Sequence, residues 1–164
     1  MKQSPIVFLD LEETVIDDWY NQKLINHIEL SQWLAQVNVD RVGIFSFAVS
    51  NERDVKTFTR DIKPRLEQEL RCEIVEDSVI TCDEMFNAST VVTGLKYDGW
   101  ADFCTIKGKT GAFADWVQSE CGPGLYVLVD DVVGDTVTHV ADRLQSIVTI
   151  NVGTIVSRHA PKKR

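Results

Sequence analysis

Near its N-terminus the chain reads Pro5-Ile6-Val7-Phe8-Leu9-Asp10-Leu11-Glu12-Glu13-Thr14, and this stretch decides the fold. Four apolar residues, from Ile6 to Leu9, run directly into the carboxylate of Asp10. An apolar run of this length is typical of a strand buried on both faces of a parallel sheet. Asp10 is then expected at the carboxyl end of that strand, where open α/β sheets bind their ligands. Because a carboxylate is costly to desolvate unless it is paired or bound to metal, this position indicates chemistry rather than packing.

The acids and the hydroxyl after this strand have a recognisable spacing, with Asp10, Glu12 and Thr14 on alternate residues. The segment resembles motif I, Asp-x-Asp-x-Thr, of the haloacid dehalogenase-like (HAD) phosphohydrolases. Asp10 and Thr14 match the motif, and Glu12 occupies the position of its second acid. The resemblance implies that Asp10 is a nucleophile that forms an aspartyl-phosphate, that Glu12 is the general acid/base, and that Mg²⁺ lies beside both.

Further strand-like apolar runs alternate with helix-like stretches, which is typical of a parallel α/β sheet. The predicted strands span 6–10, 41–47, 73–80, 125–131 and 146–152. Two predicted helices span about 20–37 and 109–120. A third begins at an N-cap at Asn51, and Pro64 kinks or splits it. A fourth has Asp135 as its N-cap and one apolar face formed by Val137, Val140, Ala141 and Leu144. We expect a Rossmann-like three-layer α/β/α sandwich with a mainly parallel five-stranded sheet.

Residues 81–106 give the weakest indication of secondary structure in the chain. Cys82 is expected to open a helix, Val91-Val92 to form a short strand, and residues 97–100 to form a turn. No insertion is long enough for a large cap domain, so we expect one domain over 1–157, followed by a basic tail over 158–164. The resemblance implies that the loop from Leu11 to Tyr20 is a flap over the site, with Trp19 and Tyr20 on it.

A second pair of acids, Asp130-Asp131, follows the most apolar strand. A divalent cation relieves the repulsion between adjacent carboxylates, and Mg²⁺ prefers carboxylate, water and phosphate oxygens. The pair resembles motif IV of the same family, whose first acid binds Mg²⁺. The predicted metal ligands are therefore Asp10, Glu12 (through a nearby backbone carbonyl), Asp130 and Asp131, the last directly or through water.

The phosphate-binding residues that the resemblance implies each have two candidates. Motif II is a Ser or Thr after the second strand, and here Ser46 is favoured over Ser50, which lies next to the N-cap. Motif III is a lysine that neutralises the nucleophile and the phosphate, and here Lys109, at the start of a helix, is favoured over Lys107. Thr14 completes the predicted phosphate-binding set.

The composition limits the partners. The 164 residues carry a net charge of −8, with 44% hydrophobic and 26% charged residues, an ordinary globular balance. An acidic chain disfavours tight nucleic-acid binding, which needs a basic patch. No apolar run is long enough to cross a bilayer and no signal peptide is visible, so we expect a cytoplasmic protein without a membrane partner.

The four cysteines, 72, 82, 104 and 121, form no CxxC pair and are expected to be reduced thiols.

The function that these features favour is a Mg²⁺-dependent phosphatase. Its substrate would be a small phosphate monoester or an exposed phosphate on a macromolecule. A non-catalytic binding or regulatory domain of the same fold is the alternative that Glu12 favours. A metal-dependent nuclease of the PIN type is disfavoured by the charge, and a phosphoacceptor receiver domain by the late position of Asp130-Asp131. The histidines, at 27, 139 and 159, are expected on helix surfaces or in the tail.

Overall fold

The computed structural model describes residues 4–159, which form an α/β fold around one sheet. The strands are β1 (Ile6–Leu9), β2 (Arg41–Phe45), β3 (Glu73–Ile80), β4 (Gly124–Asp130), β5 (Thr136–Val140) and β6 (Gln145–Asn151). They lie in the order β3-β2-β1-β4-β6-β5, and every neighbouring pair is parallel except β5 and β6. The mainly parallel α/β sheet is confirmed, but it has six strands rather than the predicted five.

The sixth strand replaces a predicted helix. Residues 136–140 form β5, antiparallel to β6, and Ala141–Arg143 form a single 3₁₀ turn. Four of the five β5 residues are β-branched, which favours a pleated strand, and the helix-like spacing of its valines is coincidental. Asp135 therefore does not begin a helix. Its carboxylate instead accepts hydrogen bonds from the Asn151 N–H, at 2.8 Å, and the Thr154 hydroxyl, at 2.9 Å.

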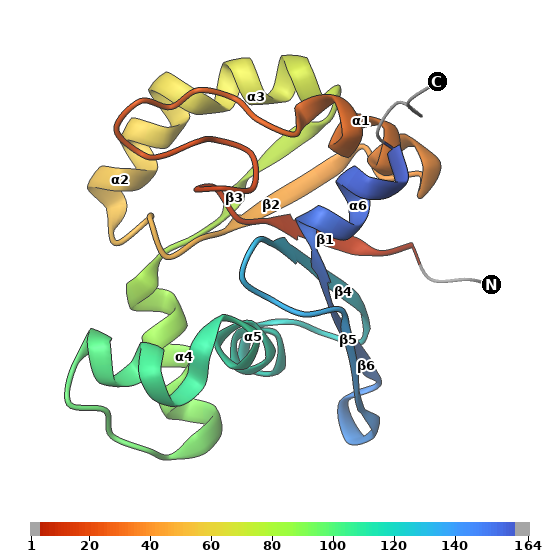
Figure 1. Cartoon of the computed structure of the whole chain (residues 1–164). Coiled ribbons are helices and arrows are strands. Elements are labelled where there is room, and N and C mark those ends of the chain that lie inside the picture. The colour runs from red at the N-terminus through yellow and green to blue at the C-terminus, as the bar shows by residue number, and fades with distance from the viewer. Residues whose placement is uncertain (1–3, 160–164) are drawn as a thin grey trace.

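Helices cover both faces of the sheet (Figure 1). One face carries α1 (His27–Gln36), α2 (Glu52–Thr57), α3 (Lys63–Leu70) and α6 (Val152–His159), and the other carries α4 (Cys82–Thr93) and α5 (Trp100–Glu120). Side chains alternate along β1, so that Val7 and Leu9 enter the hydrophobic cluster of the first face and Phe8 that of the second. The central strand is therefore buried on both sides, as its apolar run predicts.

Pro64 splits its helix as predicted. Asn51 caps α2, its side chain accepting the N–H groups of Arg53 and Asp54 at 3.0 and 3.3 Å. A π-helical segment, Phe58–Ile62, then separates α2 from α3. The wider turn lets Pro64 lie in the first turn of α3, where its missing N–H costs no hydrogen bond.

Several other elements differ from the prediction in their bounds or type. The first helix begins at His27 rather than near residue 20, because Asn26 has a left-handed backbone (φ 56°). Val91 and Val92 lie in α4 and form no strand. The predicted helix over 109–120 is the second part of α5, which Gly108 interrupts with φ 65° and ψ −178°. Of the predicted basic tail, 158–159 end α6 and 160–164 lie outside the described residues.

Candidate functional site

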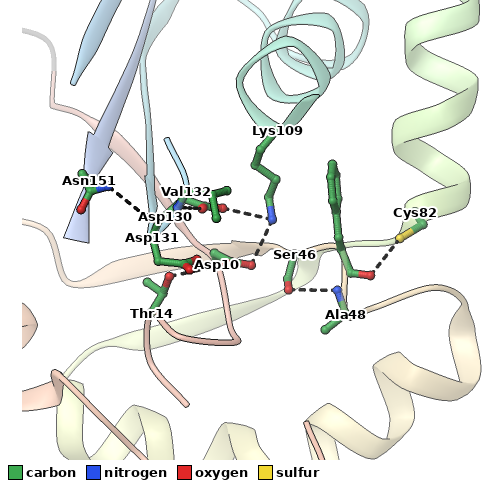
Figure 2. A network of polar contacts seen from close by, with 11 residues as sticks. Asp10, Thr14, Ser46, Ala48, Cys82, Lys109, Asp130, Asp131, Val132 and Asn151 are labelled. Atoms are coloured by element: carbon green, nitrogen blue, oxygen red, sulfur yellow. Dashed lines mark hydrogen bonds and ion pairs between the residues drawn. The ribbon is translucent and has the colours of Figure 1, made fainter. Parts of the chain in front are cut away.

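The sheet brings the two acidic segments together. Strands β1 and β4 are parallel neighbours, with Leu9 opposite Val129, so Asp10, directly after β1, and Asp130, the last residue of β4, lie at the same edge. The Asp10 N–H donates to the Val129 carbonyl at 3.0 Å, which fixes the backbone where β1 ends. One carboxylate oxygen from each of Asp10, Asp130 and Asp131 lies within 4.8 Å of those of the other two, and Figure 2 shows the three side chains together. Of the four predicted metal ligands, Asp10, Asp130 and Asp131 thus form one cluster, and the Glu12 carboxylate is not part of it.

Lys109 reaches this cluster from α5 (Figure 2). Its Nζ lies 3.0 Å from Asp10 Oδ1 and 3.1 Å from Asp130 Oδ2, and 4.4 Å from the centre of the Phe47 ring. The side chain is almost completely buried, and Gly108 directs it inward by breaking α5 immediately before it. Lys107, the other candidate, pairs instead with Asp115 at 3.0 Å and does not join the cluster.

Burial dominates the titration of the acids. It raises the pKa of Asp10, while the Lys109 ammonium and the Ser46 hydroxyl oppose that rise. Burial also raises the pKa of Asp130, with Lys109 opposing and the Asp10 carboxylate adding to the effect. The pKa of Asp131 is raised first by burial and then by hydrogen bonding with Glu13. Two of these acids share one ammonium, so the cluster carries more negative charge than its own lysine balances.

Two hydroxyl groups lie against the nucleophile candidate. Thr14 is fully buried, and its hydroxyl donates to Asp10 Oδ2 at 3.3 Å. Ser46, also buried, follows β2, and its Oγ accepts the Ala48 N–H at 3.2 Å. Ser50, the other motif II candidate, is exposed, and its N–H donates to Asp54 Oδ2 at the start of α2. Ser46 is therefore the serine that the fold brings to the acids.

Glu12 lies on a structured loop over residues 11–25. Isolated bridges pair Ile16 with Glu12 and with Leu24, so the loop folds back on itself next to the sheet edge. Glu12 Oε2 accepts the Trp19 N–H at 3.1 Å, which ties the carboxylate to the loop. Trp19 packs partly against the core, whereas the Tyr20 side chain is 94% exposed.

A cleft of about 390 Å³ opens above the cluster. Its lining is mainly acidic, with one lysine and a small apolar part: Asp10, Glu12, Glu13, Asp17, Asp18, Asp131, Lys109, Ser46, Phe47, Ala48 and Val132. Asp17 and Asp18 already accept backbone N–H groups within the 11–25 loop. The remaining acids give the cleft a strongly negative potential, which favours a cation at its base.

The cluster fits a hard divalent cation. Asp130 is fully buried, and among the described residues its Oδ2 has no hydrogen-bond partner, although it forms the ion pair with Lys109. Buried carboxylates are expensive unless cations balance them, and here Asp130 shares the single Lys109 ammonium with Asp10. The donor set consists of carboxylates from Asp10, Asp130 and Asp131, which suits an oxygen-preferring ion such as Mg²⁺, Ca²⁺ or Mn²⁺.

Sequence analysis missed Asn151, which ends β6 and supports the acidic turn. Its Nδ2 donates to the carbonyls of Asp131 and Val133 at 3.1 and 2.8 Å, and its Oδ1 accepts the Gly153 N–H at 2.8 Å. One side chain therefore links the turn after β4 to the start of α6. The available signal was a polar residue at the end of a strand, the same signal that identifies Asp10.

Comparison of the sequence with protein-family models and with curated proteins gave no match. Within residues 4–159, no helix combines the length and the apolar character that a membrane crossing requires.

Proposed function

We propose that the chain is a Mg²⁺-dependent, HAD-like phosphatase that hydrolyses a phosphate monoester through an aspartyl-phosphate on Asp10. The observation that carries the proposal is the position of Lys109, whose ammonium lies between Asp10 and Asp130. If Lys109 had a purely structural role, one carboxylate would be enough to balance its charge. Two buried carboxylates with a third close by suit a site that holds a cation and receives an anionic group. We also propose that the fold of the chain is a Rossmann-like three-layer α/β/α sandwich.

Each residue of the site has a role in the proposed reaction. Mg²⁺ would be held by Asp10, Asp130 and Asp131, with a backbone carbonyl near Glu12, and would lower the repulsion between the nucleophile and the phosphate. An Asp10 carboxylate oxygen attacks phosphorus, and the ester P–O bond breaks. Lys109 stabilises the negative charge on the phosphoryl oxygens.

Glu12 moves the protons in both halves of the reaction. It donates a proton to the leaving oxygen and then accepts one from the water that cleaves the aspartyl-phosphate, which restores Asp10 and releases inorganic phosphate. The hydroxyls of Ser46 and Thr14 supply donors beside the nucleophile, for the transferred phosphoryl group and for the carboxylate. A glutamate has nearly the same intrinsic pKa as an aspartate, so it can perform the same proton transfers.

The direct test is phosphate release from p-nitrophenyl phosphate and a panel of phosphate esters, with Mg²⁺ or with a chelator. Asp10→Asn should lower Mg²⁺-dependent turnover on the order of a thousandfold or more, because it removes the nucleophile. Asp61→Asn is the matched control, since Asp61 pairs with Arg60 on a helix surface. Folded wild-type protein that releases no more phosphate than Asp10→Asn would contradict the proposal.

A second candidate, a non-catalytic domain that binds a metal or a phosphate, is favoured by one observation. Glu12 Oε2 already accepts the Trp19 N–H, so the acid/base group also has a structural partner. Calorimetry with Mg²⁺ and inorganic phosphate, alongside turnover of Glu12→Asp and Glu12→Gln, separates the two functions. In a phosphatase, Glu12→Gln should lower turnover by about a hundredfold or more. Binding without turnover in the wild type and in Glu12→Asp would support the second candidate.

A further inference from the structure

We infer that Lys107 and Asp115 are positioning residues, whose ion pair holds the bend at Gly108 and thereby places Lys109 between the two acids. The pair joins the two parts of α5, on either side of the bend. Its effect on turnover rests on the proposed function. Its effect on where Lys109 lies does not, and can be tested separately.

The ion pair requires the bend. In a straight helix, residues 107 and 115 lie eight positions apart, or about 12 Å along the axis. Helical side chains also tilt toward the N-terminus, so the Lys107 side chain would point away from Asp115. The observed distance from Lys107 Nζ to Asp115 Oδ2 is 3.0 Å. Gly108 makes this contact possible with φ 65° and ψ −178°, a backbone conformation open essentially to glycine alone.

Gly111 provides the path for the Lys107 side chain. A Cβ built on Gly111 would lie 3.3 Å from Lys107 Cε and 3.6 Å from Lys107 Cβ. The lysine stem therefore runs directly over this glycine on its way to Asp115. Two glycines near Lys109 thus serve one arrangement: Gly108 bends the helix and Gly111 leaves room for the side chain that crosses the bend.

The Asp115 side chain, on α5, also hydrogen-bonds to a second helix, α4. The side chain is buried, and Oδ2 accepts the Ser89 hydroxyl of α4 at 2.6 Å. The Ser89 Oγ also lies 2.9 Å from the Tyr97 hydroxyl, in the segment between α4 and α5. A buried ion pair adds little net stability compared with apolar packing, but it fixes geometry when all of its groups are satisfied. This network therefore fixes both parts of α5 against α4.

The bend matters for the site because the second part of α5 begins at Lys109. Its Nζ lies between Asp10 and Asp130 with its side chain only 6% exposed. If the Lys107–Asp115 pair is removed, the first part of α5 is free to change its angle to the second. The Lys109 ammonium should then spend more time in solvent.

The test is acetylation of lysines with an N-hydroxysuccinimide ester, followed by mass spectrometry. In the wild type, Lys109 should be protected relative to the exposed Lys56. Lys107→Met and Asp115→Asn should raise the labelling rate of Lys109 by about tenfold or more. Lys107→Arg, which keeps a cation for Asp115, should stay near the wild-type rate. Arg41→Met is the control, because it removes an exposed ion pair with Glu73 remote from the bend.

Folded Lys107→Met and Asp115→Asn proteins with Lys109 still protected would overturn the inference. If Lys107→Met does not fold, Lys107→Gln gives the same test, because its shorter, uncharged side chain removes the ion pair while keeping a polar group at this position; unchanged protection of Lys109 in it also overturns the inference. Labelling needs no turnover, so its result is independent of the phosphatase assay. Where the wild type is active, kcat/KM should fall in parallel with the gain in labelling and be restored in Lys107→Arg.

Discussion

At the scale of single residues, Lys109 is the group on which the site most depends. Lys109→Met leaves Asp10 and Asp130 facing each other without a cation, which should destabilise the metal-free protein by about 3 kcal/mol. Mg²⁺ should recover part of that loss by replacing the ammonium charge. Urea unfolding with and without Mg²⁺ measures both effects, with the exposed Lys56→Met as control. Equal unfolding midpoints for Lys109→Met and Lys56→Met would show that the ion pairs contribute no stability.

The buried acids give the stability a predictable pH dependence. Burial raises the pKa of Asp10, Asp130 and Asp131 above the usual 3.8 in the folded protein. The folded state therefore binds these protons more tightly than the unfolded chain does. The stability that they contribute is complete below pH 3.8, and it is lost as the pH rises through the raised pKa values.

We therefore expect metal-free wild-type protein to lose stability, relative to Asp130→Asn, as the pH rises from about 4 to about 8. Mg²⁺ should oppose that loss most at the high end of the range, because it binds the deprotonated acids. Thermal unfolding across this range, with Mg²⁺ or with a chelator, measures the difference. Parallel curves for the two proteins would mean that Asp130 titrates alike in the folded and unfolded states.

The acids of the site were predictable from the sequence, because a carboxylate directly after a buried apolar strand has few structural explanations. Asp10 directly follows β1, and Asp130 is the last residue of β4. The choice of Lys109 over Lys107 also followed from local pattern, because the second part of α5 begins there. The support from Asn151 was not predictable, since a single asparagine has no periodicity and its partners lie about twenty residues earlier in the sequence.

At the scale of secondary-structure elements, the bend in α5 gives the sharpest prediction. A Cβ on Gly108 would meet nothing within 4 Å, so Gly108→Ala tests the backbone conformation alone. Its φ of 65° and ψ of −178° should cost a side chain about 2–3 kcal/mol. Gly94→Ala is the control, since Gly94 is also open but has a left-handed helical backbone, with an expected cost of about 1 kcal/mol. Urea unfolding should resolve the two, and equal losses would contradict the argument.

The edge of the sheet shows where a sequence pattern misleads. Residues 137–144 carry apolar side chains at helical spacing, yet they form β5, a 3₁₀ turn and the left-handed Leu144. The spacing is satisfied by only four residues, and the pairing of β5 with β6 outweighs it. The helix predicted over 109–120, with Phe113, Trp116 and Val117 inward, is present as the second part of α5.

At the scale of the whole molecule, the sheet separates two hydrophobic clusters, and the four tryptophans report on both. Trp19 and Trp33 pack against the cluster beside α1, whereas Trp100 and Trp116 belong to the cluster beside α5. Because β1 supplies side chains to both clusters, we expect one cooperative unfolding transition.

Two double variants test this cooperativity: Trp19→Phe with Trp33→Phe, and Trp100→Phe with Trp116→Phe. Within each variant, the midpoint from the remaining tryptophan fluorescence should equal the midpoint from circular dichroism. A fluorescence midpoint at lower urea in one variant would show that its reporting face opens on its own.

The position of β1 has a consequence for synthesis of the chain. This strand lies between β2 and β4, but β4 begins only at Gly124, more than a hundred residues later. On the ribosome, β1 can pair with β2 early, while its other edge waits for most of the chain to emerge. During that interval an apolar strand edge is open to wrong partners. The nucleophile candidate therefore emerges about a hundred residues before the lysine and the acids that complete its site.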